Sequence, residues 1–178
     1  MKLDKSFYSR EAEIVAKELL GKILVTNIDG LKKARIVETE AYLGPHDLAC
    51  HSSKGITKRT QVLFGPPAKT YVYIVYGMHN LLNIVTGNHN GQAVLIRAAE
   101  PILGLSGKTN GPGKLTKALG LTREHNNLSV LSDTIYLEDA AQPKEIVVTT
   151  RIGVDYAREW KDAPLRFYNS KSDYISKR

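Results

Sequence analysis

Short apolar runs with a two-residue repeat, separated by turn sequences, dominate the chain. Runs rich in β-branched residues and tyrosine are typical of strands. Near the N-terminal end and in the middle of the chain they predict strands over residues 22–27, 31–43, 69–76, 81–86 and 92–99. Toward the C-terminal end, further strands are expected over residues 134–138, 145–152 and 165–168. The brief turns at Asp29-Gly30 and at residues 87–91 favour antiparallel hairpins.

Helix signals occur at only three places. Residues 9–20 carry an apolar stripe, with Ser9 expected as the N-cap and Gly21 following the last turn. Residues 112–119 begin with proline and are followed by glycine, which is typical of a short helix. A third helix is expected over residues 155–160. Hairpin-connected strands with few helices predict an α+β fold with a largely antiparallel β-sheet.

Composition narrows the class of protein. The 178 residues, of which 42% are hydrophobic, suffice for one domain with its own core. No apolar run approaches the roughly 18 residues of a membrane helix, and the first residues lack the apolar stretch of a secretory signal. The single cysteine, Cys50, excludes an internal disulfide and zinc sites built on paired cysteines.

The balance of charge is more informative. Lysine and arginine number 25 against 18 acidic residues, a net charge of +7 and a pI of about 9.4. Such a balance suggests a polyanionic partner, with nucleic acid as the first candidate. The alternative is a protein that is basic without having such a partner.

Two acidic residues lie in the interior of the strand predicted over residues 31–43. Side chains alternate between the two faces of a strand, so Glu38, Glu40 and Tyr42 share one face. Acidic residues are unfavourable in strand interiors. Either this face is solvated and its charges are paired, or the carboxylates take part in acid–base chemistry. Strand alternation does not distinguish Glu38 from Glu40.

The strand predicted over residues 69–76 is rich in tyrosine. Tyr71 and Tyr73 share a face, whereas Tyr76 either lies on the opposite face or leaves the strand at Gly77. Tyrosines of this kind are typical of core packing with hydroxyls at the rim. In a basic domain they can also form a platform on which bases stack.

Two further motifs carry little weight alone. His46, Asp47 and His51 are close in sequence, but their spacing matches no metal-binding pattern, and we expect no metal site. The segment from Gly111 to Lys114 can hold a phosphate through free amides and the lysine at a helix start. It lacks the spacing of a Walker A loop.

Taken together, six ordered blocks resemble the alkyladenine (3-methyladenine) DNA glycosylase family. The resemblance extends from about Leu19 to Tyr168, and its blocks are residues 35–45 with His51-Ser52, 71–78 with Asn83, 94–101, 111–115, 151–154 and 164–168. It implies one mixed domain over residues 1–178, built around a curved, largely antiparallel β-sheet with flanking helices. It also implies a monofunctional enzyme without metal or cofactor, which flips a damaged purine out of duplex DNA and hydrolyses its N-glycosidic bond, leaving an abasic site.

The resemblance assigns roles residue by residue. Glu40 matches the carboxylate that activates the attacking water, and Arg97 and the Ile152 carbonyl match groups that position this water. The base-binding pocket is expected to comprise Tyr42, Ala49, His51, Tyr73, Asn83 and Leu95, with aromatic walls suited to cationic alkylated purines. Tyr76 matches the wedge that enters the duplex, with Met78 beside it. Phosphate contacts are expected from Lys58, Arg59, His79 and Lys114. His79 departs from relatives that carry an aromatic residue beside the wedge, and Cys50 adjoins the pocket.

The expected substrate is double-stranded DNA that contains 3-methyladenine, 7-methylguanine, hypoxanthine or ethenoadenine. We expect a monomer without membrane association, located in the cytoplasm with the bacterial nucleoid, or in the nucleus, and not secreted. Two rival functions are a non-catalytic nucleic-acid-binding module and a hydrolase of free nucleosides. The first has no use for Glu40 and Arg97, and the second needs neither a wedge nor a net positive charge.

Overall fold

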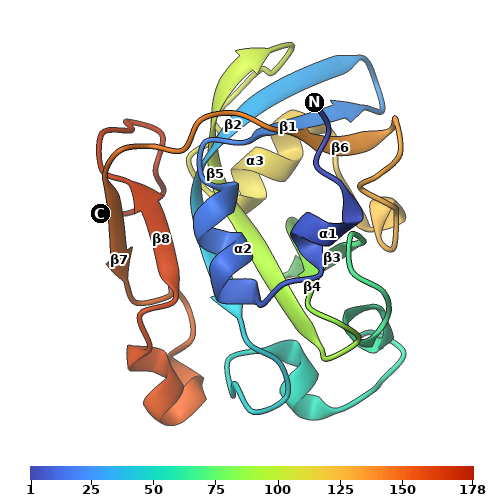
Figure 1. Cartoon of the computed structure of the whole chain (residues 1–178), viewed down its shortest axis with the longest axis vertical. Coiled ribbons are helices and arrows are strands. Elements are labelled where there is room, and N and C mark those ends of the chain that lie inside the picture. Colours follow the sequence, from blue (N-terminus) through green and yellow to red (C-terminus); the bar gives the residue numbers. More distant parts are fainter.

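The computed structural model describes residues 1–178 and contains one antiparallel sheet of eight strands (Figure 1). Six strands follow the order β3-β4-β5-β2-β1-β6, while β8 pairs with both β2 and β7. The strands are β1 (Ile23–Asn27), β2 (Leu31–Tyr42), β3 (Thr70–Val75), β4 (His79–Thr86), β5 (Gln92–Leu103), β6 (Ile135–Glu138), β7 (Ile146–Thr149) and β8 (Arg166–Asn169). The predicted α+β fold with a curved antiparallel sheet is confirmed.

Strand β2 is the centre of the sheet and has three partners. Its first part, from Leu31 to Arg35, pairs with β1, and its later residues 38–40 pair with β8 along the same edge. Strand β5 covers the other edge, with register shifts on both sides of Glu38. Such irregularities bend a strand and increase its twist. The irregularities therefore bend β2 at the segment that carries the two glutamates, within the curled sheet of Figure 1.

The helix predicted over residues 9–20 is shorter in the structure, α2 (Ala12–Leu19), and a separate helix that was not predicted, α1 (Lys5–Tyr8), precedes it. Ser9 is not an N-cap, because it ends α1 and its Oγ donates to the Lys5 carbonyl. The N-terminal end of α2 has no local side-chain cap. The Ala12 N–H donates instead to Gln92 Oε1, from β5. A tertiary contact thus replaces the cap that was expected from the neighbouring sequence.

The remaining helices are short. Helix α3 (Pro112–Leu119) has the predicted bounds, and Gly120 ends it in the left-handed conformation. The segment expected to be a helix from residue 155 is a kinked 3-10 helix, η4 (Asp155–Asp162). Three more 3-10 turns were not predicted: η1 (His51–Lys54), η2 (Gln61–Phe64) and η3 (Arg123–His125). Strand β7 ends at Thr149, earlier than expected, and Arg151 turns into the interior.

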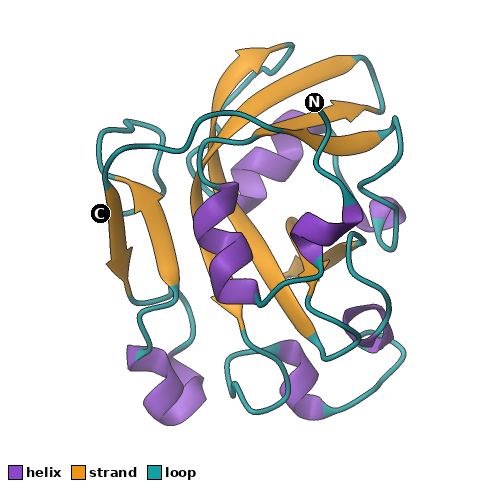
Figure 2. Cartoon of the chain, in the orientation of Figure 1, coloured by secondary structure: helices purple, strands orange, loops and turns teal.

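The main core lies between the sheet and helices α2 and α3, which Figure 2 shows against the strands. It contains 26 buried apolar residues, and both helices contribute leucines to it. Thr39 faces this side, since its hydroxyl donates to the Ala16 carbonyl of α2. Glu38 and Glu40 therefore project from the other face of β2. None of the helices is both long and apolar enough to cross a membrane.

Candidate active site

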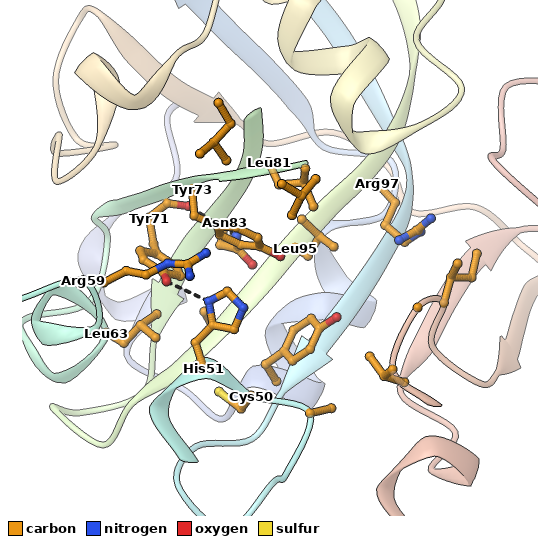
Figure 3. Close-up of a pocket in the computed structure, with 18 of the residues that line it drawn as sticks. Cys50, His51, Arg59, Leu63, Tyr71, Tyr73, Leu81, Asn83, Leu95 and Arg97 are labelled. Carbon is orange, nitrogen blue, oxygen red and sulfur yellow. Dashed lines mark hydrogen bonds between the residues drawn. The ribbon is translucent and has the colours of Figure 1, made fainter. Parts of the chain in front are cut away.

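A cavity of about 480 Å³ opens on the face of the sheet opposite α2 and is lined mostly by apolar side chains. Strands β2 to β5, the turn η1 and the segment after β7 all contribute to its walls (Figure 3). The structure brings all of the predicted pocket residues to this lining: Tyr42, Ala49, His51, Tyr73, Asn83 and Leu95. Arg97, Ile152, Tyr76 and Arg59 line it as well.

One wall of the cavity is a continuous aromatic surface. The His51 and Tyr73 ring centroids are 4.5 Å apart, and those of Tyr71 and Tyr73 are 5.4 Å apart. His51 Nδ1 and the Tyr71 hydroxyl form a hydrogen bond of 2.8 Å, drawn in Figure 3. Tyr71 was expected on this face of β3 but was not assigned to the pocket. Tyr42 reaches the cavity from β2, a different strand.

The aromatic wall is electrically neutral apart from one cation at its edge. The Arg59 guanidinium lies 5.2 Å from the centre of the Tyr73 ring. Burial, with a smaller contribution from Arg59, lowers the pKa of His51 to about 4. The imidazole is therefore neutral at pH 7 and serves as a hydrogen-bonding aromatic group rather than a charge.

Glu40 is fully buried and is held by three groups from different parts of the chain. The Tyr42 hydroxyl donates to Oε2 over 2.7 Å, and the Ile152 N–H donates to Oε1 over 2.8 Å. Arg97 Nη1 lies 3.3 Å from Oε1. All three partners line the cavity. A solvated acidic face, one of the two interpretations of the sequence, is wrong.

Glu38 is equally buried but has a different set of partners. Arg97 Nε donates to it over 3.1 Å, Arg166 Nη1 over 3.2 Å, and Ser176 through both its N–H and its hydroxyl. Neither Arg166 nor Ser176 lines the cavity. The structure thus separates the two carboxylates: Glu40 lies directly behind the cavity wall, and Glu38 lies one step further away.

Ile152 occupies the predicted place, but the contact that the structure shows is its N–H donation to Glu40. The water contact expected of its carbonyl stays a prediction. A carboxylate that accepts a backbone N–H inside a protein is oriented as well as stabilised.

A buried ion pair beneath the pocket was not expected from the sequence. Arg151 donates to both carboxylate oxygens of Asp47, over 2.6 and 2.9 Å. Its guanidinium also lies 4.9 Å from the centre of the Tyr42 ring and donates to the Ala41 carbonyl. The pair therefore ties the loop after β2 to the segment after β7 and supports Tyr42. The two residues are 104 positions apart, so no local pattern connects them.

The histidines and the cysteine near Asp47 each have their own contacts. His46 packs edge-on against Trp160, and His51 bonds to Tyr71. Cys50 lines the cavity, with Sγ 3.0 Å from the Ser52 hydroxyl. Burial raises the pKa of the Cys50 thiol. No group of three His, Cys, Asp or Glu side chains is arranged to hold a metal ion.

An exposed hairpin tip lies beside the cavity. Tyr76 is 92% exposed and Met78 69% exposed, and Tyr76 also lines the cavity mouth. The Met78 N–H closes the turn on the Val75 carbonyl, with positive φ at Tyr76 (51°) and Gly77 (66°). Of the two positions predicted for Tyr76, the one outside the strand is correct. A core role for Tyr76 is excluded by its exposure.

Cationic side chains lie beside both strands of this hairpin, next to β3 and on helix α3, which packs against β4. Lys58, Arg59 and Arg123 line a groove of about 440 Å³ that shares β3 with the cavity and has no acidic side chain in its lining. Lys114 is exposed at the start of α3, and the side chain of His79 lies against Gly113 of the same helix. Arg123 was not predicted as a contact residue.

Comparison with known proteins places the chain among relatives of similar length. A sequence model described as "Methylpurine-DNA glycosylase (MPG)" matches residues 6–173. A protein of Legionella pneumophila (strain Lens) is 52% identical, over 99% of this chain and 98% of its own length. One from Myxococcus xanthus (strain DK1622) is 49% identical, over 98% of this chain and 93% of its own. Both carry the name "Putative 3-methyladenine DNA glycosylase".

The family match extends from the first helix to the C-terminal segment. It therefore includes every element that surrounds the cavity. The two relatives are similar over nearly their whole lengths. From both comparisons it follows that this chain belongs to the methylpurine-DNA glycosylase family.

Proposed function

We propose that this protein, as one catalytic unit over residues 1–178 and as a monomer, removes alkylated or deaminated purines from duplex DNA. The purine is flipped into the cavity and its N-glycosidic bond is hydrolysed, which leaves an abasic site. The observation that carries the proposal is the position of Glu40. Its carboxylate is held by Tyr42, Ile152 and Arg97 directly behind an aromatic cavity, beside which an exposed tyrosine projects from a hairpin tip.

The chemistry follows from this geometry. A water held near Arg97 and Ile152 adds to C1′ of the sugar, and its proton passes to Glu40. The N-glycosidic bond breaks, and the base leaves with the bonding electrons. The sugar gains positive character in the transition state, which the negative Glu40 offsets. The proposed step uses only the water and these protein groups.

The lining of the cavity suits purines with added alkyl groups. 3-Methyladenine and 7-methylguanine carry positive charge in DNA, and aromatic faces attract cations. A neutral His51 adds no repulsion to such a base, since its pKa is about 4. The amide of Asn83 donates to the Tyr71 carbonyl, and from the family resemblance we expect this side chain to crowd the 2-amino group of normal guanine. Hypoxanthine and ethenoadenine are the neutral substrates that we expect.

The DNA-binding surface surrounds the hairpin tip. Tyr76 enters the gap that the flipped base leaves, with Met78 beside it, and the aromatic ring replaces part of the lost stacking. Phosphates are held by Lys58, Arg59, His79 and Lys114, to which the groove adds Arg123. Such contacts fix the position of the duplex without reading its sequence.

The central test compares Glu40→Gln with Glu38→Gln on a duplex that carries one 7-methylguanine or hypoxanthine. In Glu40→Gln the amide preserves the shape of the side chain but takes up no proton. Base release should therefore fall by at least about 10²–10⁴-fold, with lesion binding close to that of the wild type. Full activity of Glu40→Gln together with an inactive Glu38→Gln would show that the base has been misassigned.

The choice of substrate separates the proposed function from its two rivals. A binding module releases no base from any substrate, and a nucleoside hydrolase releases base from free nucleosides as readily as from duplex DNA.

Water as the nucleophile predicts an intact abasic strand, because strand cleavage by a glycosylase requires an amine that forms a Schiff base. Trapping of a covalent enzyme–DNA adduct by borohydride would contradict the monofunctional mechanism.

A further inference from the structure

The C-terminal tail after β8 reaches back to the buried carboxylate of Glu38. The Ser176 N–H donates to Glu38 Oε2 over 2.6 Å, and the Ser176 hydroxyl donates to Oε1 over 2.7 Å. These are the two shortest hydrogen bonds that Glu38 receives, since those from Arg97 and Arg166 are 3.1 and 3.2 Å long. A serine near the end of the chain thus supplies half of the donors to this carboxylate.

Ser176 is itself held firmly from both sides. Ile175 packs in a small apolar cluster with Val37, Ala98 and Tyr168. On the other side, Arg166 Nη1 donates to the Lys177 carbonyl over 2.8 Å. The tail is therefore anchored to β2, β5 and β8 on either side of Ser176, and its position follows that of the sheet.

The tail also holds the Arg97 guanidinium in place, both directly and through Glu38. The Arg97 guanidinium donates from Nε to Glu38 and from Nη2 to the Ser176 hydroxyl, over 3.3 Å. Its third nitrogen, Nη1, lies 3.3 Å from Glu40. The guanidinium is planar and rigid, so fixing two of its nitrogens fixes the direction of the third.

We infer that Ser176 is a positioning residue for the reaction: with Glu38 and Arg166 it aims Arg97 at the catalytic carboxylate of Glu40. This inference rests on the proposed function of Glu40. Ser176 does not line the cavity, so it touches neither the base nor the sugar. Glu38 is then not a second base but the link between the tail and Arg97.

The charges around Glu40 show why this aim matters. The groups around Glu40 are Glu38 and Tyr42 on its own strand, Tyr73 from β3, Tyr156 from η4, Arg151 from the segment after β7 and Arg166 from β8. Among the cations, Arg97 from β5 makes the direct contact, whereas Arg151 is bonded to Asp47 and Arg166 to Glu38. If Arg97 turned away, ionised Glu40 would lose its only directly contacting cation, while the negative charge of Glu38 would remain nearby.

Ser176→Ala removes the hydroxyl that Glu38 and Arg97 share, and Ser176→Thr retains it. In a profile of single-turnover rate against pH, the fall in rate at low pH should occur about one pH unit higher for Ser176→Ala than for the wild type. Below this acid limb of the profile, the rate of the variant should be about tenfold lower. Ser176→Thr should restore the wild-type profile. Lesion binding should be unchanged in both variants. Ser170→Ala is the matched control, because the Ser170 hydroxyl bonds only to Glu145 at the surface.

A second pair of variants guards against a simple loss of folding. Ser176→Thr and Ser176→Val have nearly the same shape and differ in the hydroxyl, and both are assayed below the onset of their melting transitions. Equal acid limbs for this pair, or a wild-type limb for Ser176→Ala, would overturn the inference. An inactive Glu40→Gln in the same assay would leave the proposed function intact, whereas an active Glu40→Gln would contradict that function first.

Discussion

At the scale of single residues, burial is the property that gives this site its chemistry. Burial, followed by the charge of Glu40, raises the pKa of Tyr42 well above its usual value. Tyr42 is therefore protonated at neutral pH and donates to Glu40. The same desolvation acts on His51 in the opposite sense, because it disfavours the charged imidazolium. The aromatic groups that line the cavity are thus all neutral.

The lowered pKa of His51 predicts how stability depends on pH. In the unfolded chain this histidine titrates near 6.5, and in the folded protein near 4. Below pH 6.5 the unfolded state therefore binds the proton first, so the free energy of unfolding should fall as the pH drops from 6.5 to 4. Urea unfolding at pH 7, 5.5 and 4.5 measures this decrease.

The control for this prediction is His51→Gln, which carries no titratable group at that position. Its free energy of unfolding should fall less than that of the wild type over the same pH interval. His89 lies exposed in the loop between β4 and β5, and His89→Gln should behave like the wild type. Parallel curves for the wild type and His51→Gln would show that His51 titrates normally in the folded state.

At the scale of elements, the β3–β4 hairpin presents Tyr76 to solvent in a conformation that tyrosine rarely adopts. Its φ of 51° lies in the left-handed region, which costs a residue other than glycine about 1 kcal/mol or more. Nothing in the core requires this side chain, because it is 92% exposed. Strain at an exposed tip next to a cavity is typical of a functional position.

Tyr76→Ala should therefore impair base flipping rather than folding or hydrolysis. The stack of one base on an aromatic ring contributes roughly 1–3 kcal/mol, and this contribution matters only where a paired base must be extruded. We expect a large loss of activity on a paired lesion and a small loss on a lesion opposite a gap. The melting temperature should change little.

Ile102→Ala provides a matched control for the hairpin variant, since Ile102 is a partly exposed apolar residue near the end of β5. The activity of this variant on both substrates and its melting temperature should be close to those of the wild type. Equal losses of Tyr76→Ala on the paired and the pre-opened lesion, with a clearly lowered melting temperature, would contradict the wedge role.

At the scale of the whole molecule, the net charge is +7, and several of the cations lie beside the strands of the β3–β4 hairpin. The groove on one side contains Lys58, Arg59 and Arg123, and Lys114 lies on the side of α3. Counterions released from the duplex make such binding dependent on salt. Part of the basic charge that the sequence shows as a total therefore lies next to this hairpin.

Binding to duplex DNA should weaken steeply with salt, with a slope of about −0.9 in log K against log[salt] for each phosphate neutralised. Lys114→Ala and Arg123→Ala should each reduce this slope by about one contact and should weaken damaged and undamaged duplexes alike. Fluorescence anisotropy over a series of salt concentrations measures the slope.

Lys171→Ala is the control for the salt dependence. Lys171 lies near the C-terminal end and is already paired with Glu145. Its slope should equal that of the wild type. A flat salt response of the wild-type protein would favour a hydrolase of free nucleosides over an enzyme that acts on DNA.

The sequence by itself determined most of the secondary structure. Alternation of apolar positions located all eight strands to within a few residues, and the proline and glycine at its ends located α3. These are local signals: side-chain alternation, turn residues and helix ends depend on neighbours a few positions away. For the same reason the sequence placed Glu38, Glu40 and Tyr42 on one face of a strand and Tyr71 and Tyr73 on one face of another.

Only the tertiary structure decided what those faces meet. The end of α2 is capped by Gln92 rather than by Ser9, Arg151 pairs with Asp47, and Ser176 holds Glu38. Each of these contacts joins residues at least 80 positions apart. Burial, too, arises from the packing of distant segments. Both glutamates are fully buried, and the partners that those segments supply separate Glu40, behind the cavity wall, from Glu38, beside the tail. A local pattern carries no information about which distant segment will cover it.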